Sequence, residues 1–138
     1  MKKRLSIWMT VLFLSLLIGC GGGGEGGNDS HSGEPSPPTV LTAGYESTSN
    51  TTGVGHGNVT SDGGVPPVFE RGICWGTIPD PSKENGTCIG TSAGTGPFSE
   101  VLTGVLNDGS LTNYMRAYAI NAIGISWGYS KLITMKTH

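Results

Sequence analysis

The sequence predicts an all-β protein, a seven-stranded sandwich of two sheets, in the hundred residues from Thr39 to His138. Two observations lead to this prediction. Glycine and proline interrupt the region repeatedly, as in "GVGHGN", "SDGGVPP" and "IPDPS", so no stretch has the apolar spacing of an amphipathic helix. Between these turn signals lie short segments rich in Val, Ile, Thr, Tyr and Trp, which are typical of sandwiches and barrels.

Seven segments are expected to form strands, and seven strands in a chain of this length favour two packed sheets. In chain order they are Val40–Tyr45, Thr52–Thr60, Val68–Trp75, Thr87–Thr91, Phe98–Leu106, Asn113–Ile120 and Ser126–Met135.

The alternation of side chains is clearest along Asn113–Ile120, as expected for a half-buried strand. One face would carry small and apolar residues that let the opposing sheet approach. The inward face would consist of Met115, Ala117 and Ala119, and the outward face of Tyr114, Arg116 and Tyr118.

The N-terminus has the organisation of a secretory signal. Residues 1–4 include three basic side chains, and the fifteen residues 5–19 are apolar except for three hydroxyl side chains. This run is shorter than the roughly 20 residues that a membrane-spanning helix needs. The ending "LIGC" resembles the lipobox of bacterial lipoproteins, which implies that residues 1–19 are removed and that a diacylglycerol is attached to Cys20. The alternative is an ordinary signal peptide with an incidental cysteine, or an uncleaved short anchor.

Residues 20–38 are expected to form a tether between the lipidated cysteine and the folded domain, residues 39–138. The segment is rich in glycine, proline and polar residues and cannot bury a core. Without the signal, the chain has five basic and ten acidic residues, a net charge of −5. This charge argues against nucleic acid as a partner. The membrane, reached through the lipid, is the expected partner at this end.

Four motifs in the predicted domain resemble the fibronectin type III-like repeats that are common in surface and secreted proteins of Bacteroidota and some deltaproteobacterial lineages. They are "VTSDGG", "ERGICWGT", "GTGPFSEVLTG" and "YMRAYAINAIG", and the likeness covers Pro38 to Thr137. The resemblance implies an immunoglobulin/fibronectin type III-like sandwich but says little about a ligand. Such domains usually place a tyrosine at the turn into the strand that holds Arg116, where this chain has Asn113. Either Tyr114 takes over that corner, or the corner is looser here.

The two cysteines of the domain are expected to form a disulfide. Cys74 and Cys88 are an even pair in an exported chain, and they lie in neighbouring predicted strands. Two buried free thiols are the alternative.

No arrangement of residues predicts catalysis, and the expected function is not enzymatic. The three histidines are too scattered for a zinc site, and no Ser, His or Asp lies in a recognisable nucleophile motif. Asp80, Glu84 and Asn85 lack the Asp-x-Asp spacing that gathers calcium ligands, so they are expected to be solvated turn residues. The sequence predicts no metal and no cofactor besides the covalent lipid on Cys20.

Two functions from different classes fit these features. One is a surface lipoprotein that displays a binding or adhesion module for a protein or glycan; the other is a spacer or an accessory subunit of a larger envelope assembly. Gly21 follows the cysteine where an aspartate would retain an enteric lipoprotein in the inner membrane, so the resemblance favours the outer membrane. A domain that faces the periplasm and one that faces the cell exterior are both consistent with the sequence.

A candidate binding face follows from the outward row of aromatic residues and arginine, which are frequent in interface hot spots. The row is Tyr114, Arg116 and Tyr118, extended by Trp127 and Tyr129 in the next strand. A structural role is favoured over binding for this row. In that role the side chains cover the sheet and stack across strands. The loops "SDGGVPP" and "NAIGIS" are equal candidates, since they are expected to share one end of the sandwich.

Overall fold

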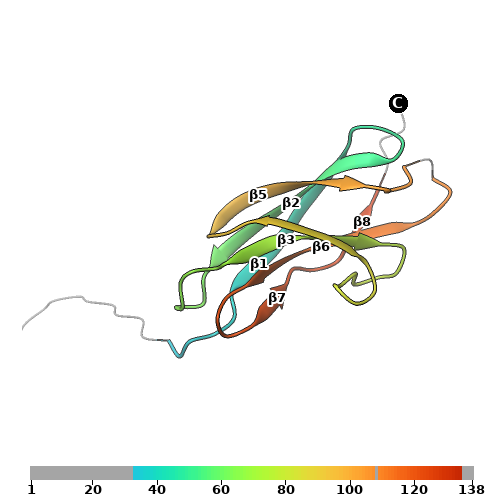
Figure 1. Ribbon diagram of the computed structural model, residues 1–138. Helices are drawn as coiled ribbons and strands as arrows, with labels where there is room; N and C mark the ends of the chain where they lie inside the picture. Colours follow the sequence, from blue (N-terminus) through green and yellow to red (C-terminus); the bar gives the residue numbers. More distant parts are fainter. Residues whose placement is uncertain (1–32, 108, 135–138) are drawn as a thin grey trace, which may run out of the picture. The chain divides into compact units, whose positions relative to one another are not determined.

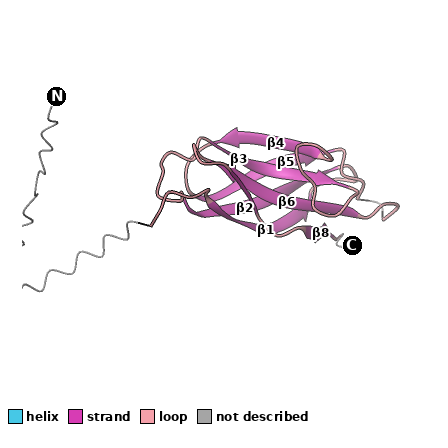
Figure 2. Ribbon diagram, turned by 90° about the horizontal axis from the view of Figure 1, so that it is seen from below, coloured by secondary structure: helices cyan, strands magenta, loops and turns pink. Residues whose placement is uncertain are grey.

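The computed structural model describes residues 33–107 and 109–134, and this part of the chain contains eight strands and no helix (Figures 1 and 2). The all-β prediction is confirmed. The strands are β1 (Thr39–Ser47), β2 (Thr52–Ser61), β3 (Glu70–Gly76), β4 (Thr87–Ser92), β5 (Gly96–Thr103), β6 (Asn113–Ile120), β7 (Ile125–Trp127) and β8 (Lys131–Ile133).

The strands form two antiparallel sheets that face each other, as Figure 2 shows from below. One sheet has three strands in the order β1-β2-β5, and the other has five, in the order β4-β3-β6-β7 with β8 also paired to β6. This arrangement is consistent with an immunoglobulin/fibronectin type III-like sandwich. Apolar side chains from both sheets fill the space between them, among them Val40, Val59, Ile73, Trp75, Phe98, Leu102, Met115 and Ala117.

The glycines of the "GVGHG" segment face inward from β2 and make room for larger neighbours. A Cβ on Gly57 would lie 2.5 Å from the Phe98 ring and 2.9 Å from the Cβ of Ala117. A Cβ on Gly55 would approach Leu102 at 3.1 Å. The segment is therefore a packing feature of the core, in which side chains from elsewhere fill the volume that the glycines leave.

The last predicted strand, Ser126–Met135, is wrong as one element, because it is divided into β7 and β8 by a break at residues 128–130. The amide of Gly128 donates to the Ala117 carbonyl at 2.8 Å. The Ala117 amide, on the same edge of β6, instead donates to the Thr42 hydroxyl of the opposite sheet at 2.9 Å. Gly128 lies so close to Thr42 that a side chain would clash. A threonine from the facing sheet therefore takes the place that a continuous strand would fill.

The predicted disulfide is confirmed. Cys74 and Cys88 face each other directly across the β3–β4 pair, with their Cα atoms 4.0 Å apart. The bridge closes the β3–β4 loop, residues 77–86, across a sequence separation of 14. Closing a loop of this size stabilises a fold by about 3 kcal/mol in the chain-entropy model.

The corner before β6 is held by Asn113 itself, so neither of the two expected alternatives applies. Its side-chain amide donates to the carbonyl of Leu106 at 3.0 Å and to that of Leu111 at 3.3 Å. These bonds reach back to the backbone upstream, as the hydroxyl of a corner tyrosine does in immunoglobulin-type sandwiches. A buried asparagine thus replaces the tyrosine.

Candidate functional site

The side chains of β6 alternate between two faces as predicted, but the outward face is not fully exposed to solvent. Met115, Ala117 and Ala119 are buried in the core. Tyr118, on the opposite face, is only 1% exposed. The interpretation of Tyr118 as an exposed binding residue is therefore not supported by its position, and the neighbours that cover it explain why.

Three neighbours cover the Tyr118 ring. The Lys83 ammonium lies 4.7 Å from the ring centroid, and the Trp127 ring lies 5.5 Å away on the next strand. Gly90 in β4 has no side chain at the point where the Tyr118 hydroxyl approaches. The hydroxyl donates to Glu70 Oε1 at 2.6 Å, and Lys83 Nζ donates to the same oxygen at 2.7 Å.

This arrangement shifts two pKa values in opposite directions. Burial, followed by the bond to the Glu70 carboxylate, raises the pKa of Tyr118 well above its ordinary value. The hydrogen bond from Lys83, followed by that from Tyr118, lowers the pKa of Glu70. Both shifts favour the state in which the carboxylate accepts from the phenol, so the two groups stabilise each other's protonation state.

Arg116 also makes its contacts within the domain. Its Nε donates to the Pro81 carbonyl at 2.7 Å, and its guanidinium lies 4.1 Å from the centroid of the Trp127 ring. The Asp80 carboxylate lies 3.9 Å from the other end of the group. The β3–β4 loop therefore crosses the outer face of the five-stranded sheet and is held there by the residues that the sequence suggested for binding.

The remaining members of the predicted face do not form one surface. Tyr114 and Trp127 are half-buried, whereas Tyr129 is 87% exposed. Tyr129 lies in the break between β7 and β8 and not in a strand. The geometry supports the structural role for Arg116, Tyr118 and Trp127, and leaves Tyr129 as the one strongly exposed aromatic side chain of the row.

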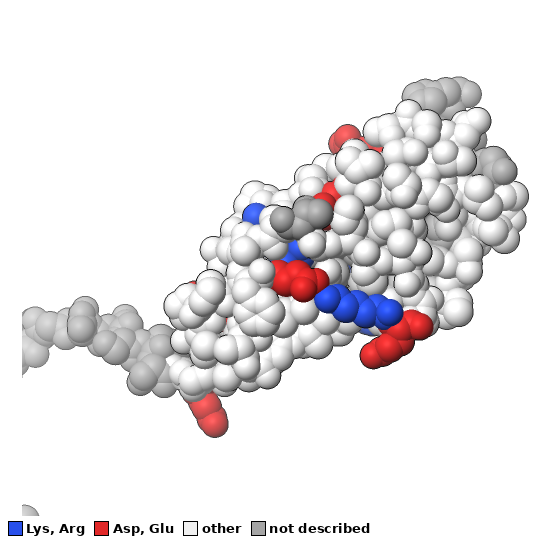
Figure 3. Space-filling model, in the orientation of Figure 1, with Lys and Arg blue, Asp and Glu red and all other residues white. Residues whose placement is uncertain are grey.

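The basic side chains of the described residues all make contacts within the domain. Arg71 Nη1 donates to the carbonyls of three successive residues, 94–96, and the guanidinium lies 5.1 Å from the Phe98 centroid. Lys131 Nζ donates to the Ala43 carbonyl at 2.7 Å. Lys83 and Arg116 are engaged as described above. On the face drawn in Figure 3, charged side chains lie in small groups of both signs, which is not the footprint of a polyanion site.

The two loops predicted to share one end of the sandwich do so. Asn121, at the end of β6, donates to the Asp62 carbonyl in the β2–β3 loop at 2.8 Å. Its amide group also donates to the Ser36 carbonyl at 2.8 Å, and the Ser36 amide donates to the Gly63 carbonyl at 3.0 Å. Ser36, in the segment predicted as tether, is therefore fastened to this end, which we call the proximal pole.

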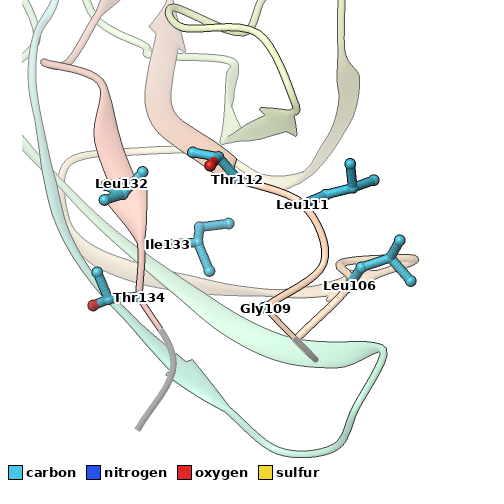
Figure 4. A pocket seen from close by; sticks show the side chains of 7 residues that line it. All are labelled: Leu106, Gly109, Leu111, Thr112, Leu132, Ile133 and Thr134. Atoms are coloured by element: carbon cyan, nitrogen blue, oxygen red, sulfur yellow. The ribbon is translucent and has the colours of Figure 1, made fainter.

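The opposite end of β6 borders a hollow that sequence reasoning missed (Figure 4). The hollow has a volume of about 340 Å³ and lies between the β5–β6 loop and β8. Ile133 points from β8 toward that loop in Figure 4, and Leu106, Leu111 and Leu132 are exposed around it. We call this end the distal pole. The length of the "LNDGSL" segment was the signal in the sequence, since a shorter connection between the two sheets would leave less space.

The loop that holds Asp80, Glu84 and Asn85 uses its side-chain oxygens for contacts within the domain. The Asn85 side-chain oxygen accepts from the Ser82 amide at 2.6 Å and from the Ser82 hydroxyl at 3.1 Å. Glu84 Oε2 lies 3.3 Å from the same hydroxyl. Among the described residues, no group of three or more His, Cys, Asp or Glu side chains could hold a metal ion.

A serine–histidine pair lies on the outer face of the three-stranded sheet. His56 Nδ1 is 2.7 Å from Ser99 Oγ. The other ring nitrogen, Nε2, is buried and makes no hydrogen bond within the described part of the protein. Catalytic pairs of this kind need a third group that orients the ring, and no acidic side chain bonds to this one.

Comparison with known proteins adds no relative: no protein-family model, no curated protein and no solved structure matches the chain. In the part that the structure describes, no helix has the length and apolar character needed to cross a membrane. Cys20 and the predicted signal peptide lie outside the described residues.

Proposed function

We propose that this protein is an exported lipoprotein, anchored through Cys20, whose sandwich is a non-catalytic binding or adhesion module. The motif "LIGC" after a short apolar run supports the anchor, and the resemblance to repeats of surface and secreted proteins supports an exported domain. The lipid on Cys20 is the only attached group in this proposal. The cell envelope, with the outer membrane favoured, is its location.

The observation that carries the proposal is that the chain enters the domain at one end of β6, whereas the hollow lies at the other end. The chain arrives from the anchor at Ser36, which binds Asn121 just after β6. The hollow borders the other end of β6, before Asn113. Eight residues at about 3.4 Å each place these two ends about 27 Å apart. A domain held at the proximal pole therefore turns the distal pole toward a partner.

The chemistry of the distal pole favours an uncharged partner. Leu106, Leu111 and Leu132 are exposed beside the hollow. No basic side chain of the described residues is left without an internal contact, so a strongly anionic ligand would find little to pair with. The expected partner is a protein segment with apolar side chains or a glycan that presents an apolar ring face.

The anchor is tested by Cys20→Ala. Without the thiol no thioether can form, so the variant should stay unprocessed or be released in soluble form. Detergent phase partition of wild type and variant measures this directly. Equal partition of both proteins into the detergent phase would contradict the lipid anchor.

The second candidate is an accessory subunit of a larger envelope assembly. The leucine-lined hollow favours it as well, because a permanent protein partner would cover that apolar surface. Capture of the intact lipoprotein from its own envelope separates the two functions. A stoichiometric protein partner supports the accessory role, whereas loose capture of glycan or matrix supports adhesion. Leu111→Ser should weaken either interaction, while Val101→Ser, an exposed apolar residue on β5, should not.

A further inference from the structure

We propose that the proximal pole is a membrane-contacting surface, in which Phe69, Ile123 and Ile125 touch the bilayer that holds the lipid of Cys20. This inference rests on the anchor proposed above and adds a second point of contact with the same membrane. It assigns a role to exposed apolar side chains that neither the core nor the hollow uses.

The three residues come from different segments that meet at this pole. They are 54%, 50% and 38% exposed, respectively. The Phe69 amide donates to the Ile120 carbonyl at 3.0 Å, and Ile120 is the strand partner of Ile125. Ile123 lies in the turn between them, which the bond from the Asn121 amide to the Gly124 carbonyl closes at 3.1 Å. Single exposed apolar residues need no explanation, but a group at one end of a domain does.

The path of the chain identifies the bilayer as the occupant of this surface. Ser36 is fastened to the β2–β3 loop and to Asn121 at this pole, and fifteen residues of the sequence separate it from Cys20. A glycine-rich coil of that length has a root-mean-square span of about 20 Å. This span is shorter than the length of β6, so the linker favours the proximal pole over the distal pole at the membrane surface.

The charges at this pole indicate an apolar contact and not an electrostatic one. Arg71, the nearest basic residue in the sequence to Phe69, is occupied by the carbonyls of residues 94–96. The Asp62 carboxylate accepts from the Gly64 amide at 2.9 Å within its own loop. Aromatic and aliphatic side chains without neighbouring cations partition into the boundary between headgroups and acyl chains independently of lipid charge. The contact should therefore form on zwitterionic lipid and persist at high salt.

The test uses the full mature lipoprotein in phosphatidylcholine vesicles and places a tryptophan at each pole. Phe69→Trp reports on the proximal pole and Leu111→Trp, similarly exposed, on the distal pole. Brominated lipid quenches tryptophan that reaches the acyl region. Relative to wild type, which contributes Trp75 and Trp127, Phe69→Trp should gain a quenched and blue-shifted component that 1 M salt leaves unchanged, and Leu111→Trp should gain none.

A second tryptophan variant at the proximal pole controls for a local folding defect caused by Phe69→Trp. Ile123→Trp should behave as Phe69→Trp does, and the unfolding midpoint of each variant should match that of wild type. Equal quenching at both poles, or its loss in salt, while the protein still floats with the vesicles would overturn the membrane contact and leave the anchor intact. Failure of the protein to float with the vesicles would overturn the anchor and this inference together.

Discussion

Tyr118 shows how a single side chain can belong to the outer face of a sheet and still be buried. Its ring is covered by Lys83 and Trp127, and its hydroxyl shares the Glu70 carboxylate with Lys83. The alternation along β6 correctly predicted which face Tyr118 is on. It could not predict exposure, because part of the cover, Lys83, comes from the β3–β4 loop, whose course depends on contacts distant in sequence.

Tyr118→Phe isolates the hydroxyl from the ring. The variant keeps the stacking but removes the donor to Glu70, so the free energy of unfolding should fall by about 1 kcal/mol. Urea denaturation measures the change. Tyr129→Phe is the matched control, since that residue is 87% exposed, and it should leave stability unchanged. Equal effects at the two positions would contradict the role assigned to the Tyr118–Glu70 bond.

Glu70 makes part of the stability dependent on pH. Its pKa is lowered in the folded state by the bonds from Lys83 and Tyr118, so the folded protein holds this proton less tightly than the unfolded chain. The contribution is complete above the ordinary glutamate value of about 4.3 and is lost as pH falls through the lower folded-state pKa. Between pH 7 and pH 3, wild type should therefore lose more stability than Glu70→Gln. Parallel stability curves for the two proteins would show that the carboxylate has no such role.

At the scale of strands, sequence patterns predicted every strand of the sandwich except at its last edge. Turn signals located β1 to β6 to within a few residues, since glycine and proline mark strand ends for local steric reasons. β3 begins at Glu70 and not at Val68, although the Phe69 amide already donates to the Ile120 carbonyl of β6. The division of the last strand depends on Thr42, about 85 residues earlier in the chain, and no local pattern contains that contact.

The inward glycines of β2 provide a prediction about packing between the sheets. Gly57→Ala places a Cβ against the Phe98 ring and Ala117, so it should destabilise the protein by about 1 to 3 kcal/mol. Gly44→Ala, on the neighbouring strand β1, has nothing within 4 Å of the new Cβ and should change stability by less than about 0.5 kcal/mol. Chemical denaturation of both variants measures the difference. Coincident unfolding curves would mean that the core accommodates the extra methyl group.

At the scale of the whole molecule, Asn121 joins the segment that precedes β1 to the end of β6 and to the β2–β3 loop. It is 2% exposed, and its amide group donates to Ser36 and Asp62 while its oxygen accepts from the amides of Ile123 and Gly124. The sequence placed the two loops at one end correctly. It did not predict that Ser36 is fastened there, because a polar segment rich in glycine and proline carries no signal for a contact made through backbone groups.

Asn121→Ala should loosen the proximal pole as a unit. Four hydrogen bonds are lost, and we expect a decrease of about 2 kcal/mol in the free energy of unfolding. Release of Ser36 should also speed the exchange of its amide hydrogen with solvent, because that amide is bonded to the Gly63 carbonyl in wild type; NMR follows the exchange. Asn58→Ala, on the half-exposed face of β2, should do neither. An unchanged exchange rate of the Ser36 amide in Asn121→Ala would show that other contacts hold Ser36 at this pole.

The division of the last strand has a consequence wherever many copies of the protein lie close together. An uninterrupted strand at a sheet border offers a row of free amides and carbonyls to which a neighbouring molecule can add its own strand. Here that border consists of two pieces of three residues each, and the gap between them is closed from behind by Thr42. The proposed anchor would raise the local concentration of such borders in one plane, where a broken border would keep adjacent domains from joining edge to edge.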